Sequence, residues 1–121
     1  MVARIIADNL KCPLLAAEDD PPLNGLDDII IVLSNTGDEE MPQPMEDFLA
    51  SMVVRGKRYV VCELGNYFGF ENYSGCKKEV FKIAQALEWK LLSDVSIDSY
   101  PAVDEESLQR WIASVKNLFL H

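Results

Sequence analysis

The sequence predicts an α/β domain with three layers, in which helices cover both faces of a doubly wound, mostly parallel sheet. Two observations carry this prediction. Segments with the apolar spacing of helices alternate along the chain with short apolar runs typical of strands. The two clearest runs, Asp28–Ser34 and Tyr59–Leu64, are mostly apolar and do not alternate with polar residues, as expected for strands that are buried on both faces.

Length and composition indicate one globular domain and limit its partners. The chain has 121 residues, of which 49% are hydrophobic, so we expect one domain with a packed core over residues 1–121. It carries 11 Lys and Arg against 20 Asp and Glu, a formal net charge of −9. This charge disfavours nucleic acid and anionic membranes and suits a basic protein partner, although acidity that only maintains solubility is an open alternative.

The cysteines and the histidine exclude several kinds of site. Cys12, Cys62 and Cys76 are widely spaced, so neither a disulfide framework nor a metal site is expected, and we expect a reduced, cytoplasmic protein. No apolar run approaches the ~20 residues that span a membrane. The only histidine, His121, is the last residue, and the sequence has no G-x-S-x-G, so a hydrolase is disfavoured.

The first quarter of the chain predicts a helix and two strands. Met1–Leu10 has helical spacing, and Pro13 cannot continue that helix. Pro13–Ala17 reads as a short strand, and a loop rich in acidic residues and proline separates it from the strand Asp28–Ser34. No helix lies between these two strands, so we do not expect them to be direct parallel neighbours.

The second helix is expected from Pro44 to Val54, because proline is favoured in the first turn of a helix. The residues of its predicted apolar face are Phe48, Leu49, Met52 and Val53. The strand Tyr59–Leu64 follows, and then a third helix is expected over Cys76–Trp89.

The last part of the chain predicts one strand and one helix. Leu91–Ile97 is mixed in polarity, which places it at an edge of the sheet. Asp104 is the expected N-cap of the final helix, and Trp111 lies on its apolar face. We expect both Trp89 and Trp111 to be core residues.

An aromatic loop follows the buried strand Tyr59–Leu64 and is the first candidate site. It contains Tyr67, Phe68, Phe70 and Tyr73. Ligands of open α/β sheets bind just outside the carboxyl ends of the strands. Flat apolar rings bind a flat ring ligand better than a phosphate or a metal. The alternative, which is equally open, is that these aromatic residues bind no ligand and only cover the top of the sheet.

These features together resemble the flavodoxin family, over almost all of the chain from Val2 onward. Ser34–Asp38, S-N-T-G-D, is similar to the flavin loop S-T-W/Y-G-D/E, and Glu63–Asn66, E-L-G-N, to the G-x-G-D that opens the second flavin loop. Phe70–Cys76 looks like the Y-E-x-F-C-G-A stretch that closes it. Asp98 with the Trp111 helix is similar to the D-x-x-P…W ending of the family.

The resemblance implies a sheet of five strands in the order 2-1-3-4-5, with FMN at the carboxyl ends of the strands. It also implies an electron carrier, more than a stand-alone enzyme, which works with a redox protein partner. Phe70 falls at the place of the family's stacking tyrosine, with Tyr67 as a substitute. The cofactor-binding residues that it implies are Ser34, Asn35, Thr36, Gly37, Asp38, Gly65, Asn66, Tyr67, Phe70, Tyr73 and Gly75.

The sequence departs from the family at three places. The opening strand and its phosphate loop, T/S-x-T-G-x-T, are expected before Val2 and are absent from this sequence. Thr36 stands where many members have an aromatic residue, and Asn66 replaces the usual Asp. We therefore expect a domain without strand 1, for one of three reasons. The chain is truncated at its N-terminus, a homodimer fills the gap by swapping, or Pro13–Ala17 has moved into it.

Two functions remain open on this basis. One is an FMN-binding electron-transfer protein or domain. The other is a degenerate flavodoxin-like scaffold that binds no flavin and serves as a structural module or a module for protein interaction.

Overall fold

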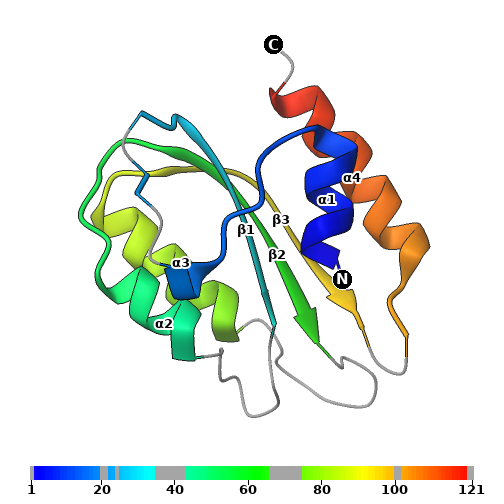
Figure 1. Cartoon of the computed structure of the whole chain (residues 1–121), viewed down its shortest axis with the longest axis horizontal. Coiled ribbons are helices and arrows are strands. Elements are labelled where there is room, and N and C mark those ends of the chain that lie inside the picture. The colour runs from blue at the N-terminus through cyan, green and yellow to red at the C-terminus, as the bar shows by residue number, and fades with distance from the viewer. Residues whose placement is uncertain are drawn as a thin grey trace.

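The computed structural model describes residues 2–19, 22–23, 25–34, 43–65, 75–99 and 102–119. Helices and strands alternate along them (Figure 1). The elements are α1 (Val2–Leu10), the short 3₁₀ helix η1 (Ala17–Asp19), β1 (Asp28–Ser34), α2 (Gln43–Ala50), β2 (Arg58–Gly65), α3 (Gly75–Ala86), β3 (Lys90–Asp98) and α4 (Glu105–Phe119).

Three parallel strands form the sheet that the described residues contain. Their order, β1-β2-β3, is the order of the chain (Figure 1). Asp28 lies opposite Arg58 at one end of the β1–β2 pair, and Gly65 lies opposite Asp98 at the other end of the β2–β3 pair. All three strands were predicted, and β3 lies at an edge of the sheet, as its mixed polarity indicated. The order agrees with the 3-4-5 part of the implied sheet.

Helices cover both faces of the sheet and create two cores. Tyr59 and Val61 of β2 pack with α2 and α3 on one face, whereas Val60 and Cys62 pack with α1 and α4 on the other. Successive side chains of a strand point to opposite faces, so β2 contributes to both cores. Its interior is buried on both faces, as predicted. Trp89 and Trp111 are core residues, as predicted.

The predicted strand Pro13–Ala17 is wrong. Residues 12–16 form no helix or strand, and they lead from α1 to η1, which lies against α2 (Figure 1). A strand needs a neighbour to pair its backbone groups. An apolar cavity separates this segment from β1, so it has no such neighbour. For the same reason this segment does not fill the expected gap in the sheet.

The burial of β1 also differs from the prediction. Ile31 and Leu33 are buried, whereas Ile29, Ile30 and Val32 are only half-buried, although the run of β-branched residues indicated burial on both faces. Among the described strands β1 pairs with β2 alone, so its other edge has no neighbouring strand to cover these side chains.

The second and third helices are shorter than predicted. α2 ends at Ala50, so Val53 leaves the apolar face that we expected and is 80% exposed. α3 ends at Ala86. The residues after α2 form hydrogen bonds with residues that follow α3, and they do not continue α2. The Gly56 amide donates to the Leu87 carbonyl at 3.1 Å, and Nε1 of Trp89 donates to the Val54 carbonyl at 2.7 Å.

The final helix begins as predicted. Asp104 caps α4, since its Oδ1 accepts a hydrogen bond from the Ser107 amide at 3.2 Å and its Oδ2 accepts one from the Ser107 hydroxyl at 2.7 Å. These hydrogen bonds lower the pKa of the Asp104 carboxyl. None of the described helices is long and apolar enough to cross a membrane.

Candidate functional site

The carboxyl ends of the three strands lie side by side (Figure 1). We call this boundary of the sheet, which runs across all three strands, the carboxyl edge. Ser34 pairs in register with Leu64, and Gly65 pairs with Asp98. In parallel α/β sheets this edge is where ligands bind. The structure therefore places the starts of three connecting loops, after Ser34, Gly65 and Ser99, around one candidate site.

Three of the predicted cofactor-binding residues lie in the described part of the chain. Ser34 ends β1, Gly65 ends the neighbouring β2, and Gly75 is the first residue of α3. The structure thus brings Ser34 and Gly65 to the same edge, as predicted. The other predicted residues lie outside the described residues: Asn35, Thr36, Gly37, Asp38, Asn66, Tyr67, Phe70 and Tyr73.

Ser99 connects two of the strand ends and was not predicted as a site residue. Its amide donates to the Gly65 carbonyl at 2.9 Å, and its hydroxyl lies 3.5 Å from the same oxygen. The Asp98 carbonyl, one residue earlier, accepts a hydrogen bond from the Asp104 amide at 2.9 Å. These bonds fix the start of the loop after β2 against the start of the connection to α4. A hydroxyl residue directly after a strand was the available signal in the sequence.

A buried polar network lies just inside the same edge. Glu63 of β2 is fully buried, and its Oε2 accepts a hydrogen bond from the Lys77 amide at 2.8 Å. Lys77 is 6% exposed, and its Nζ lies 2.9 Å from Oδ2 of Asp94 on β3. The network ties the first turn of α3 to both strands beneath it. Its signal in the sequence was a glutamate inside an otherwise apolar strand.

Glu63 also changes what the N-terminus of α3 offers a ligand. The first amides of a helix attract anions, because they have no partner within the helix. Here the Glu63 carboxylate already binds the Lys77 amide in the first turn of α3. A phosphate at this helix start would meet an internal carboxylate, so the arrangement disfavours a phosphate there.

The residues at the described helix starts bear on whether a phosphate can bind. The strand ends meet at one edge of the sheet, where the Ser99 amide binds the Gly65 carbonyl. The first turn of α1, residues 2–5, contains no Ser or Thr that could donate to a phosphate. The phosphate half of FMN therefore has no hydroxyl cradle among the described residues at these two helix starts.

The described residues support neither a site with Cys62 as a nucleophile nor a metal site. Cys62 is fully buried, and burial raises the pKa of its thiol to about 12, so it is a poor nucleophile. Across the same ranges no three His, Cys, Asp or Glu residues are grouped so that they could hold a metal ion.

Comparison with known proteins identifies the fold. No protein-family model matches the sequence, and no curated protein matches it. Solved structures do match. Oxidised flavodoxin 1 from Bacillus cereus is 21% identical with a TM-score of 0.73, over 93% of this chain and 84% of that chain. A flavodoxin from Streptococcus pneumoniae is 25% identical with a TM-score of 0.69, over 93% and 83%. Oxidised flavodoxin 2 from B. cereus is 21% identical with a TM-score of 0.65, over 97% and 91%.

These similarities show that the chain has a flavodoxin-like α/β fold, and they confirm the predicted fold class. The expected absence of the first strand and of the phosphate loop stays a prediction, because the comparisons do not test it.

Proposed function

We propose that this protein is a flavodoxin-like electron carrier, which binds the isoalloxazine ring of FMN at the carboxyl edge of its sheet. The observation that supports the proposal most is the similarity in fold to flavodoxins over 93% of the chain or more. In this proposal FMN supplies the redox chemistry, and the protein holds and covers its ring.

The residues assigned to the ring come from two loops. Residues 34–38 pass along one side of the ring, and residues 65–73 cover the other side, with Phe70 stacked on it. Ser99 holds the start of the second loop, because its amide donates a hydrogen bond to the Gly65 carbonyl. The net charge of −9 suits a basic redox protein as the electron-transfer partner.

The phosphate of FMN contributes little in this proposal. A hydrogen bond to a charged group contributes about 1.5–3 kcal/mol, so a full phosphate loop would favour FMN over riboflavin by orders of magnitude. The described starts of α1 and α3 offer no hydroxyl group to a phosphate, so in this proposal the two flavins differ only by weak contacts. We therefore expect the dissociation constants of FMN and riboflavin to agree within about tenfold, which is about 1.4 kcal/mol.

The test is a titration of purified protein with FMN and with riboflavin, followed by flavin fluorescence and the visible spectrum. Quenching by both flavins is the expected result. Phe70→Ala should weaken both flavins, whereas Val53→Ala, at a residue that is 80% exposed and lies outside both loops, serves as the control. If millimolar FMN gives no quenching, the electron-carrier proposal is wrong for this chain.

A second function, a scaffold for protein interaction without flavin, is favoured by one observation. Among the described strands β1 pairs with β2 alone, and an apolar cavity borders its other edge. A protein with this function would bind a polypeptide there and leave both flavins unquenched. The flavin titration therefore separates the two functions.

A further inference from the structure

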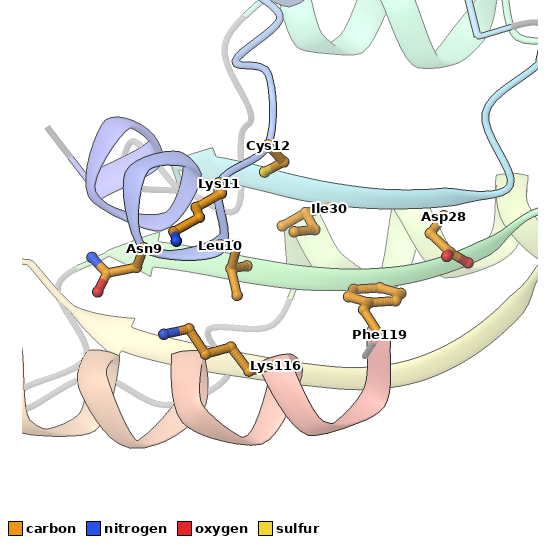
Figure 2. Close-up of a pocket in the computed structure, with 8 residues that line it drawn as sticks. All are labelled: Asn9, Leu10, Lys11, Cys12, Asp28, Ile30, Lys116 and Phe119. Atoms are coloured by element: carbon orange, nitrogen blue, oxygen red, sulfur yellow. The ribbon is translucent and has the colours of Figure 1, made fainter. Parts of the chain in front are cut away.

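We draw no further inference here: the strongest candidate, the apolar cavity beside β1 with the pocket that continues it between the ends of α1 and α4 (Figure 2), carries none, because nothing in the structure shows what covers it.

Discussion

Glu63 provides the sharpest test of how the candidate site is held together. Its carboxylate is fully buried in β2, and its Oε2 accepts the Lys77 amide of α3 at 2.8 Å. Replacing Glu63 by alanine leaves that amide without this acceptor in a dry environment. The first turn of α3 then loses a direct bond to the sheet at the edge where we place the site.

The size of the effect follows from two contributions. A hydrogen bond to a carboxylate contributes about 1.5–3 kcal/mol. The one lost methylene group contributes about 0.8 kcal/mol. We therefore expect Glu63→Ala to lower the free energy of unfolding by about 2–4 kcal/mol. At about 4 °C per kcal/mol for a domain of this size, the midpoint of thermal unfolding falls by about 8–16 °C. Glu63→Gln keeps the shape and an acceptor oxygen and should cost about 1 kcal/mol.

The assay is urea unfolding followed by circular dichroism, with thermal unfolding as a second measurement. Glu79→Ala is the matched control, because Glu79 is exposed on α3 and pairs only loosely with Lys82, at 3.4 Å. Its loss should cost less than about 0.5 kcal/mol. If the two alanine variants are equally stable, Glu63 does not anchor α3 to the sheet and the reasoning is refuted.

Three further predictions concern single groups. The Cys62 thiol keeps its proton up to about pH 12 when folded, whereas the unfolded thiol loses it near pH 9.0. The free energy of unfolding should therefore fall by about 2–3 kcal/mol between pH 9 and about pH 11, measured in urea, and Cys62→Val should remove that part of the slope. Asp104→Ala should lower the thermal midpoint at pH 7, while Asp104→Asn keeps the cap. Because the pKa of Asp104 is lowered in the fold, the difference between parent and alanine variant should vanish as the pH falls through that pKa. Trp89→Phe removes the bond from Nε1 to the Val54 carbonyl and should cost about 1–2 kcal/mol in urea unfolding; no change would show that water replaces the bond.

Strands and helices whose signals are local were predictable from the sequence. The β-branched run 28–34 and the apolar run at Tyr59 form the expected strands, and the Asp104 cap starts the expected helix. Each signal lies within a few residues of the element that it specifies, so the sequence contains the whole cause.

Features that depend on distant partners were not predictable. Residues 13–17 have the composition of a strand, but a strand needs a neighbouring strand to pair with. The cavity separates these residues from β1, so β1 is not that neighbour. Val53 continues a helical pattern, yet the backbone leaves the helix because Val54 and Gly56 bond to residues more than 30 positions later. The Glu63 bond to Lys77 depends on the packing of α3 on β2 in the same way.

The strand ends at which we place the candidate site were predictable, whereas the residues assigned to the cofactor stay predictions. A strand that ends at Gly65 before an aromatic loop indicated the carboxyl edge of the sheet, and the structure places Ser34 and Gly65 there. Ser99 was missed because its role comes from the register of β3 beside β2, which no single segment specifies.

The position of β2 between two strands and two cores has a consequence for hydrogen exchange. β2 forms hydrogen bonds with a strand on each side, and its side chains are buried in both cores. Exchange of Val60, Val61 and Cys62 then requires the whole domain to open, whereas β1 can open from its outer edge alone. The amides of β2 should therefore report the global free energy of unfolding, whereas those of β1 report a smaller opening.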